Sequence, residues 1–388
     1  MPPLNTFKRS SIAIALSHAI ALPLQAATIT VDSTSDTPTA NVCSLRSAII
    51  AANTNAPVDG CVAGDVSGSD TIDLTGLPNN STITLNGNEL PTVISTISLN
   101  GPGQDNLIIS GNNNSRIVSV EEGGDLTVSS ITLSNGSIPG RFNHGGAIQV
   151  VAGNLTINSS TLFNNSAGDD GGAIHARRES SMSLNNSTVS GNSASRGGGI
   201  YAGFRSNVNL SNSTVSGNSA GESGGGIYAG SRSNVNLSNS TVSSNFALSS
   251  NGGGIDVSSS SHITLSNSII ANSLGSGDCF DPFGNLTFDT ASIIEDGSCG
   301  ATALVGDIGL APLANNGGPT QTHALLANSP ARNAGIVSTC TTTDQRGKSR
   351  QEAFFVPIVA ANKNIAVVDL GGDDACDIGA FEFSAGDE

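Results

Sequence analysis

A histidine, two tyrosines and an aspartate hold the same position in consecutive copies of a repeated segment. These side chains are His175, Tyr201, Tyr228 and Asp256, with Gln149 one copy earlier. Three arginines lie a few residues further along, and they are Arg178, Arg205 and Arg232. If the copies stack in register, an aromatic stripe runs beside an arginine stripe on one face. We expect such a face to stack sugar rings and to bind carboxylates, because arginine forms forked hydrogen bonds to them.

Several uses of this face are open from the sequence. In an eliminating polysaccharide lyase, a tyrosine or histidine would take the C5 proton while an arginine neutralises the uronate carboxylate. Hydrolysis would instead need acids, for which Asp170 and Asp256 are the candidates. Tandem duplication alone would also align the side chains, since residues 199–215 and 226–242 are nearly identical. We therefore assign His175, Tyr201, Tyr228, Asp256 and the three arginines to a candidate ligand-contact face and name no catalytic residue.

The repeat that aligns these residues ends in Gly-Gly-Ala/Gly-Ile. Its isoleucines are Ile148, Ile174, Ile200, Ile227 and Ile255, at steps of 26, 26, 27 and 28 residues. Periods of this length indicate a solenoid whose units bury their apolar faces against their neighbours. The unit is rich in Gly, Ser, Asn and Thr and has short alternating runs without helical periodicity. The repeat predicts an all-β fold, a parallel β-helix with one coil per copy.

Alternation within each copy predicts which side chains face the core. In one strand Ile174 and Ala176 point inward while His175 points outward, and in the next strand Met182 and Leu184 fill the core. Two residues further along are four asparagines, namely Asn186, Asn212, Asn239 and Asn267. Because side chains alternate along a strand, these asparagines should also point inward. Burying an amide is costly unless it forms hydrogen bonds. We expect them to form a buried amide ladder from coil to coil.

The residues before the glycine pairs carry charge. Asp169 and Asp170 precede one pair, and Arg196 and Glu222 hold similar positions in the next two copies. We expect a solvated corner with cross-coil ion pairs, which stabilise little at a surface.

The first residues of the chain predict export. Lys8 and Arg9 precede a mostly apolar stretch, Ser11 to Leu24, and cleavage is expected after Ala26. The stretch is shorter than the roughly 20 residues that span a bilayer. We therefore expect a signal peptide at 1–26 and no transmembrane segment after its removal.

Six cysteines lie beyond this segment, and six cysteines allow 15 connectivities. A solenoid keeps sequence neighbours close in space, so we expect three local disulfides. They are Cys43–Cys61, Cys279–Cys299 and Cys340–Cys376. Disulfides of this kind indicate an oxidising compartment.

The net charge of −16, with only three lysines, excludes partners that need a basic footprint. Nucleic acid and anionic membranes are such partners. Acidic glycans are poorer partners unless calcium bridges the two surfaces. A cluster of Asp373, Asp374 and Asp377 is the candidate calcium site, because calcium prefers several oxygen ligands. The five histidines are scattered and no Cys-x-x-Cys occurs, so we expect no zinc site and no other cofactor.

The expected organisation has four parts. A signal peptide covers 1–26, and an N-terminal cap with an amphipathic helix from Cys43 to Asn53 covers 27–66. The β-helix covers 67–272, with regular repeats at about 141–272, and a disulfide-bonded C-terminal cap covers 273–383. Within that cap we expect Asp344 with Arg346, and Asp377 with Glu382, to make buried or half-buried pairs.

Several motifs resemble those of exported bacterial β-helix proteins. Cys43-Ser-Leu-Arg-Ser-Ala-Ile resembles the CSLREA motif, with Ser47 in place of glutamate. The tail segments Asn315-Asn-Gly-Gly-Pro-Thr, Asp344-Gln-Arg-Gly and Asp377-Ile-Gly-Ala-Phe-Glu resemble the choice-of-anchor Q domain. Gly-Gly-Ala-Ile and Phe163-Asn-Asn-Ser resemble the GGAI and FxxN repeats of chlamydial polymorphic outer-membrane proteins. The resemblance implies a right-handed, pectin-lyase-like β-helix exported to the cell surface or secreted by a bacterium.

The sequence therefore favours a non-catalytic, adhesion-type protein that binds an extracellular glycan or a surface protein through a repetitive face. The alternative is a pectin-lyase-like polysaccharide lyase or glycoside hydrolase acting on an extracellular polysaccharide, because one fold serves many functions.

Overall fold

The computed structural model describes residues 26–66, 68–249, 251–301, 307–350, 355–359, 365–369, 375–384 and 387. Residues 1–25 of the expected signal peptide, and Asp373 and Asp374 of the expected calcium site, lie outside the described residues. None of the described helices is long and apolar enough to cross a membrane.

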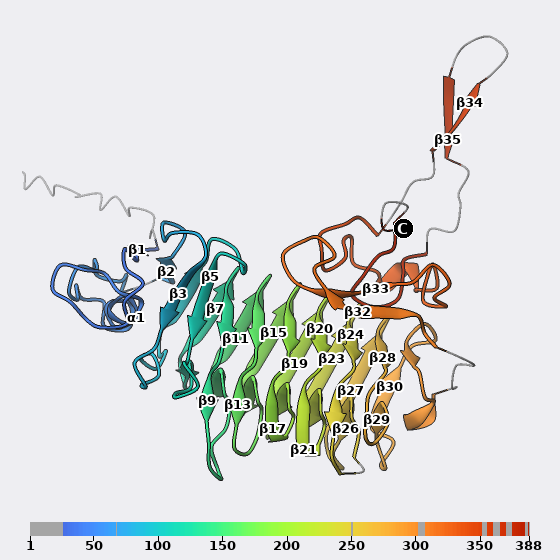
Figure 1. Ribbon diagram of the computed structural model, residues 1–388, viewed down its shortest axis with the longest axis horizontal. Coiled ribbons are helices and arrows are strands. Elements are labelled where there is room, and N and C mark those ends of the chain that lie inside the picture. The colour runs from blue at the N-terminus through green and yellow to red at the C-terminus, as the bar shows by residue number, and fades with distance from the viewer. Residues whose placement is uncertain are drawn as a thin grey trace, which may run out of the picture.

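Stacked coils form one long parallel solenoid (Figure 1). A regular coil contains four strands, so two short strands add to the two that alternation predicts. Each strand pairs in parallel with its equivalent in the next coil, as Ile148 does with Ile174 and Ile174 with Ile200. The predicted β-helix is therefore confirmed.

Strands of the same kind build four parallel sheets along the solenoid. The ten-stranded sheet contains β1 Thr28–Thr30, β2 Asp70–Asp73, β4 Thr96–Asn100, β7 Asp125–Ser129, β11 Asn154–Asn158, β15 Ser181–Asn185, β19 Asn207–Ser211, β23 Asn234–Ser238, β27 His262–Ser266 and β30 Leu286–Phe288. The seven-stranded sheet contains β6 Val118–Val120, β10 Ile148–Val151, β14 Ile174–Arg177, β18 Ile200–Ala202, β22 Ile227–Ala229, β26 Ile255–Val257 and β29 Cys279–Phe280.

The other two sheets close each coil. The nine-stranded sheet contains β3 Ser81–Thr84, β5 Leu107–Ser110, β8 Thr132–Ser134, β12 Thr161–Phe163, β16 Thr188–Ser190, β20 Thr214–Ser216, β24 Thr241–Ser243, β28 Ile269–Ala271 and β31 Ile293–Ile294. The five-stranded sheet contains β9 Ser137–Ile138, β13 Ser166–Ala167, β17 Ser193–Arg196, β21 Ser219–Ser223 and β25 Phe246–Ala247. The solenoid thus continues to Ile294, one coil beyond the boundary expected at 272.

A buried amide ladder joins the regular coils at the corner between the nine- and five-stranded sheets. Its members are Asn165, Asn192, Asn218 and Asn245. The side-chain amide of Asn192 donates to Oδ1 of Asn218 at 2.9 Å, and the backbone N–H of Asn192 donates to the same oxygen at 3.0 Å. The same two bonds recur from Asn165 to Asn192 and from Asn218 to Asn245. Each buried amide is therefore bonded by its neighbour in the next coil.

The ladder expected at Asn186, Asn212, Asn239 and Asn267 is wrong. These four residues turn the chain in the left-handed region, with φ between 46° and 51°, and asparagine tolerates that conformation better than most residues. A left-handed residue interrupts the alternation of the strand, so parity no longer sets the side-chain direction. The amides of Asn212, Asn239 and Asn267 instead donate to carbonyls of the C-terminal region, those of Thr343, Thr339 and Ile336.

Two devices cover the ends of the apolar core. At the N-terminal end, helix α1 (Leu45–Thr54) buries Leu45, Ala48 and Ile49, and the hydroxyl of Ser44 caps its first turn. At the other end, a loop containing the 3₁₀ helix η1 (Ser298–Gly300) packs Cys299 against the core. The predicted disulfides Cys43–Cys61 and Cys279–Cys299 hold these two segments, and both are confirmed.

The C-terminal region lies against the side of the solenoid rather than against its end, except for a hairpin that projects away from the coils (Figure 1). It contains β32 Leu310–Ala314, β33 Thr322–Leu325, the 3₁₀ helix η2 Val337–Thr339, and the hairpin β34 Phe355–Val359 and β35 Ile365–Asp369. Its Gln345 bridges the outward threonines of the nine-stranded sheet, donating to Oγ1 of Thr188 at 2.9 Å and accepting from Thr214 at 2.7 Å. The region therefore covers part of the outer face of that sheet.

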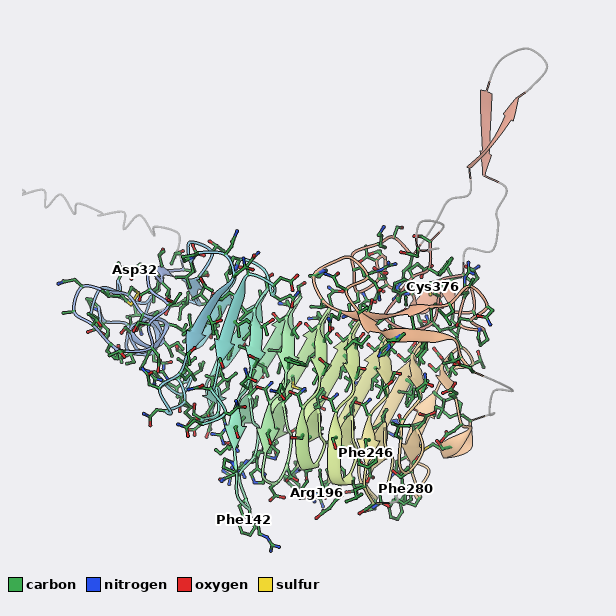
Figure 2. All side chains as sticks on the ribbon, in the orientation of Figure 1. Asp32, Phe142, Arg196, Phe246, Phe280 and Cys376 are labelled. Atoms are coloured by element: carbon green, nitrogen blue, oxygen red, sulfur yellow. A yellow bond between two sulfur atoms is a disulfide. The ribbon has the colours of Figure 1, made fainter. Side chains whose placement is uncertain are left out.

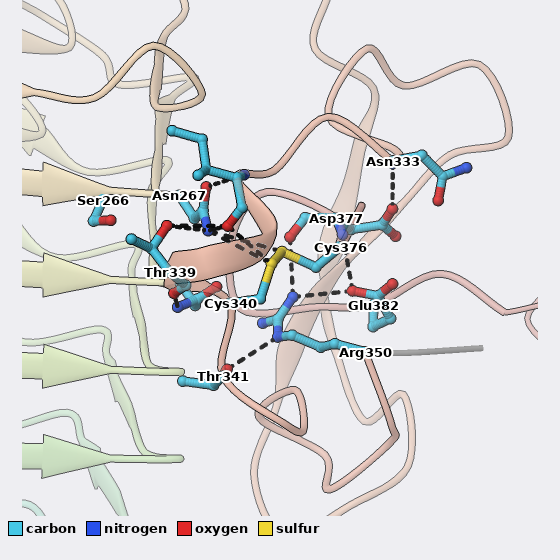
Figure 3. Close-up of a disulfide and its surroundings, with 12 residues drawn as sticks. Ser266, Asn267, Asn333, Thr339, Cys340, Thr341, Arg350, Cys376, Asp377 and Glu382 are labelled. Atoms are coloured by element: carbon cyan, nitrogen blue, oxygen red, sulfur yellow. Dashed lines mark hydrogen bonds and ion pairs between the residues drawn. A yellow bond between two sulfur atoms is a disulfide. The ribbon is translucent and has the colours of Figure 1, made fainter. Parts of the chain in front are cut away.

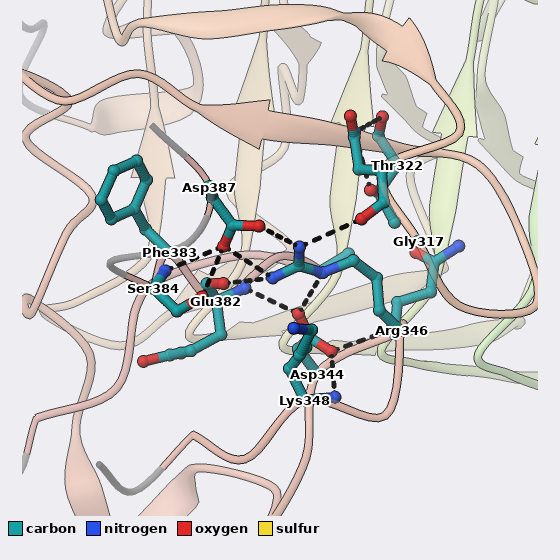
Figure 4. Close-up of polar contacts among 12 residues, drawn as sticks. Gly317, Thr322, Asp344, Arg346, Lys348, Glu382, Phe383, Ser384 and Asp387 are labelled. Carbon is teal, nitrogen blue, oxygen red and sulfur yellow. Dashed lines mark hydrogen bonds and ion pairs between the residues drawn. The ribbon is translucent and has the colours of Figure 1, made fainter.

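Two buried arginines organise this region. Arg346 forms an ion pair with Asp344 at 2.8 Å, as expected, and a second with Asp387 at 2.8 Å (Figure 4). Arg350 pairs with Glu382 at 3.1 Å beside the predicted disulfide Cys340–Cys376, which is confirmed (Figure 3).

The expected pairing of Asp377 with Glu382 is therefore only partly right. The backbone N–H of Asp377, not its carboxylate, donates to Glu382, whose charge is balanced by Arg350. The carboxylate oxygens of Asp377 accept from the backbone of Asn333 and Phe383. Each oxygen of Asp377 thus holds one backbone N–H of the C-terminal region.

We predict that Asn218→Ala destabilises the solenoid by about 3 kcal/mol, because it leaves the buried N–H groups of Asn192 without their acceptor. Urea unfolding would measure the change. The control is Asn236→Ala, whose exposed amide bonds only to exposed Asn209 and whose loss should cost little. Equal losses in the two variants would contradict the role given to the buried ladder.

A second prediction concerns pH. Burial raises the pKa of Asp278 to about 6, from 3.8, although backbone donors oppose the shift. The folded protein therefore binds this proton more tightly than the unfolded chain does. Protonated Asp278 thus adds to the free energy of unfolding at a pH below the pKa of the unfolded chain, and this contribution is lost as the pH rises through about 6. Asp278→Asn should remove up to about 3 kcal/mol of the fall in unfolding free energy between about pH 4 and pH 7. Glu122→Gln, at an exposed position, should not. An unchanged pH dependence in Asp278→Asn would contradict this.

Candidate functional site

The outward side chains of the seven-stranded sheet form one continuous column. Gln149 pairs with His175, His175 with Tyr201, Tyr201 with Tyr228, and Tyr228 with Asp256. Strand pairing therefore places the predicted column in register.

The aromatic members of this column stack on one another. The ring centroids of His175 and Tyr201 are 5.1 Å apart, and those of Tyr201 and Tyr228 are 5.0 Å apart with an interplanar angle of 11°. His144, from the loop before β10, extends the stack, with its ring 4.5 Å from that of His175. Because the inner ring faces contact each other, no sugar ring can stack between them, and ring edges and hydroxyls remain for recognition.

A second column of polar residues stands beside the stack. Its members directly precede the glycines at each corner, and they are His144, Asp170, Arg196 and Ser223. Gly197, with φ of 61°, begins the corner after Arg196, and a Cβ on Gly198 would lie 2.4 Å from the carbonyl oxygen of Ser219. Only glycine allows so close an approach. We call these four residues the corner column; Arg196 marks its place at the lower edge of Figure 2.

The corner column is partly buried, which corrects the solvated corner expected from sequence. Asp170 is 4% exposed and accepts two hydrogen bonds from the Arg196 guanidinium, from Nε to Oδ1 at 2.9 Å and from Nη2 to Oδ2 at 3.1 Å. The Arg196 guanidinium also lies 5.3 Å from the ring centroid of Tyr201 and 5.6 Å from that of Tyr228. The cross-coil ion pair is therefore present, and it contacts the aromatic stack.

The three predicted arginines lie elsewhere. Arg178, Arg205 and Arg232 occupy left-handed turns at the far end of the strands, with φ of 58° to 59°. Arg205 pairs there with Glu179 at 2.8 Å, and its side chain is 49% exposed. The nearest ring to Arg205 and Arg232 is Phe204, at 4.9 and 5.6 Å. The arginine that contacts the tyrosines is Arg196, from the opposite end of the strands.

Arg177 is the functional candidate that sequence reasoning missed. It lies two residues beyond His175 in β14, so its side chain shares the outward face. Its Nε is buried and has no hydrogen-bond partner among the described residues. In the next coil the equivalent position is Gly203, where a Cβ would lie 3.1 Å from that of Arg177 and 3.2 Å from the Tyr201 ring. The glycine leaves room for both side chains.

Burial sets the protonation of this face. It holds the pKa of His175 well below its usual range and lowers that of His144, so both imidazoles are neutral at pH 7. Burial also raises the pKa of Asp170 to about 6, against the opposing charge of Arg196, and that of Asp256 to about 6. Burial and the charge of Asp170 raise the pKa of Tyr201 above its usual value. At neutral pH the phenol therefore keeps its proton and can donate a hydrogen bond to a ligand.

Three side chains of this region could hold a metal ion. Donor atoms of His144, Asp170 and His175 all lie within 4.8 Å of one another, and no similar group occurs elsewhere in the described part of the chain. The Nδ1 atoms of both histidines are buried and have no hydrogen-bond partner in the described part of the chain. The expectation that scattered histidines exclude a zinc site is thus wrong in its premise, since the coils bring two of them together. The signal was the position before each glycine pair, where His144 and Asp170 are equivalent.

One other contact has the form of catalytic machinery. Ser216 Oγ lies 2.8 Å from Nε2 of His323, whose Nδ1 lies 2.7 Å from the carbonyl oxygen of Ala311. Nearby, Gly217-Asn218-Ser219-Ala220-Gly221 has the spacing of a nucleophile elbow but lies in solenoid strands rather than between a strand and a helix. Ser216 is 3% and His323 4% exposed beneath the C-terminal region. A substrate cannot reach this pair, so it is structural.

Comparison with known proteins supports the architecture. Residues 152–310 match the family described as the right-handed β-helix region. No curated protein and no solved structure shows significant similarity to the chain. The matched residues contain the coils from β11 onward and most of the candidate site, whereas His144 and Gln149 lie before the match. The stacked coils therefore have the fold of a right-handed parallel β-helix.

Proposed function

We propose that the seven-stranded sheet is a non-catalytic binding face for an acidic, uronate-containing extracellular glycan. The observation that carries the proposal is Arg177, a half-buried guanidinium on this face whose Nε has no acceptor among the described residues. An unpaired buried donor is costly, and a ligand carboxylate would satisfy it with a charge-assisted hydrogen bond. Tyr201 and Tyr228 supply hydroxyl groups alongside, and the regular spacing of the coils suits an extended chain.

The distribution of charge supports an acidic ligand at this place. Residues 116–232 contain seven arginines and seven acidic residues, a balance of zero. The rest of the chain carries eight basic and 24 acidic residues, which accounts for the whole net charge of −16. The segment that builds most of the face thus carries no net charge, so an anionic chain meets less repulsion there than over the strongly acidic remainder.

An extracellular location fits this ligand. Three disulfides join all six cysteines, which suits an oxidising compartment. The CSLREA-like, choice-of-anchor-like and GGAI motifs add a resemblance to exported bacterial surface proteins. We infer that the protein is exported by a bacterium and acts as an adhesion-type protein at the cell surface or after release.

The catalytic alternatives find less support. For elimination, burial raises the pKa of Tyr201 and so disfavours the phenolate that would act as the base, and His175 is only 3% exposed. For hydrolysis, Asp170 and Asp256 belong to coils three steps apart, about 14 Å at the usual strand spacing. Paired carboxyls of glycoside hydrolases lie within roughly 9.5 Å of each other. A lyase or hydrolase therefore remains an outcome for the test rather than the proposal.

We predict that Arg177→Ala weakens binding of oligomers of pectate, alginate or chondroitin at least about tenfold, because one charged hydrogen bond is lost. Arg232→Ala is the matched control: it removes the same charge from an exposed turn of the same solenoid and should change affinity less than about twofold. Tyrosine fluorescence would report binding, since Tyr201 and Tyr228 are the only tyrosines and the chain has no tryptophan. Equal losses in the two variants would contradict the assigned face.

The same glycans test for catalysis. We expect neither unsaturated chain ends, read by ultraviolet absorbance, nor new reducing ends after long incubation, with or without calcium. Neutral glycans serve as the control for charge. Product formation that is lost in Tyr201→Phe would replace the binding function with an enzymatic one.

A further inference from the structure

Three lone-pair atoms converge where the corner column meets the aromatic stack. Nδ1 of His144 lies 3.4 Å from Oδ2 of Asp170, and Nδ1 of His175 completes a group whose members lie within 4.8 Å of each other. His175 is 3% exposed, and neither of these two Nδ1 atoms has a hydrogen-bond partner among the described residues. A buried acceptor without a donor is costly. None of the three atoms carries a positive charge, so a cation could bind among them without replacing one.

We propose that His144, Asp170 and His175 form a binding site for a divalent transition-metal ion of the zinc class. Two imidazole nitrogens and one carboxylate oxygen are the donors that zinc and its neighbours prefer. Calcium favours six or more oxygen ligands, which this group does not offer. Three protein ligands would leave a fourth tetrahedral position for water or for a ligand carboxylate.

Part of the geometry is already suitable. Donor atoms around a tetrahedral zinc ion lie about 3.4 Å apart, given bonds of about 2.1 Å. His144 and Asp170 already have this separation. The carboxylate can keep its bonds to Arg196, because it has about four lone-pair positions and the guanidinium fork uses two.

The stacked rings must separate for the third ligand to bind. His144 and His175 lie nearly parallel, at 17°, and parallel rings cannot direct their in-plane lone pairs at one ion. His144 is on the loop that follows β9, between the corner and the solvent, and its side chain is 16% exposed, so its ring is the one free to turn. Metal binding should therefore disturb the stack and change the emission of Tyr201 and Tyr228.

The test is titration of the untagged, chelator-treated protein with Co²⁺, without glycan. We expect uptake of one equivalent, visible d–d absorption, quenching of tyrosine emission and displacement by Zn²⁺ but not by excess Ca²⁺. His144→Ala and Asp170→Asn should each weaken binding at least tenfold. His262→Ala, which removes an exposed histidine of β27, is the matched control and should bind as the parent does.

Three results would overturn the proposal. They are no stoichiometric uptake by the parent protein, unchanged affinity in His144→Ala, and an equal loss in His262→Ala. His144 is the primary substitution because its side chain is partly exposed, and circular dichroism would establish that each variant is folded. Because no glycan is present, failure here leaves the glycan-binding function untouched, and failure of glycan binding leaves the metal site untouched.

Discussion

The in-register pairing of each strand with its equivalent in the next coil is the constraint on which the rest of the structure depends. Main-chain hydrogen bonds fix a step of about 4.8 Å between coils, so a side chain that recurs in the repeat must contact its own copy. Where the copies are asparagines, as at Asn192 and Asn218, the contact is a hydrogen bond and the amide can be buried. Where they are aromatic, as at Tyr201 and Tyr228, the contact is a ring stack.

The candidate site arises where two such columns meet. The glycines before each isoleucine bring the corner column against the aromatic stack, and Arg196 joins them by contacting both Asp170 and Tyr201. Most polar groups in the solenoid find their partners one coil away. Nine buried side-chain atoms of the described residues lack a hydrogen-bond partner, and three of them lie together in this region: Nε of Arg177 and Nδ1 of His144 and His175. Groups that the fold leaves without partners are the ones available to a ligand or an ion.

How much of this could be predicted depends on whether strand parity holds. Within strands it does, so the inward Ile174 and the outward His175 were predictable from alternation. The three disulfides were predictable for a different reason, because a solenoid keeps sequence neighbours close in space. At left-handed turns it fails, which is why Asn212 binds the C-terminal region instead of forming a ladder, and why Arg205 lies away from the tyrosines. His144 was missed because only the charged residues were considered at the repeated position before the glycines, and Arg177 was missed because the next coil has Gly203 at its position. The importance of both depends on burial and missing partners, which spacing does not reveal.

The most direct test of the account is a crystal structure of the protein bound to a uronate oligosaccharide. The account predicts electron density along the seven-stranded sheet, with a carboxylate hydrogen-bonded to Arg177 and sugar hydroxyls near those of Tyr201 and Tyr228. Density confined to another surface, such as the pocket between the nine-stranded sheet and the C-terminal region that Phe163 and Gln321 line, would contradict it.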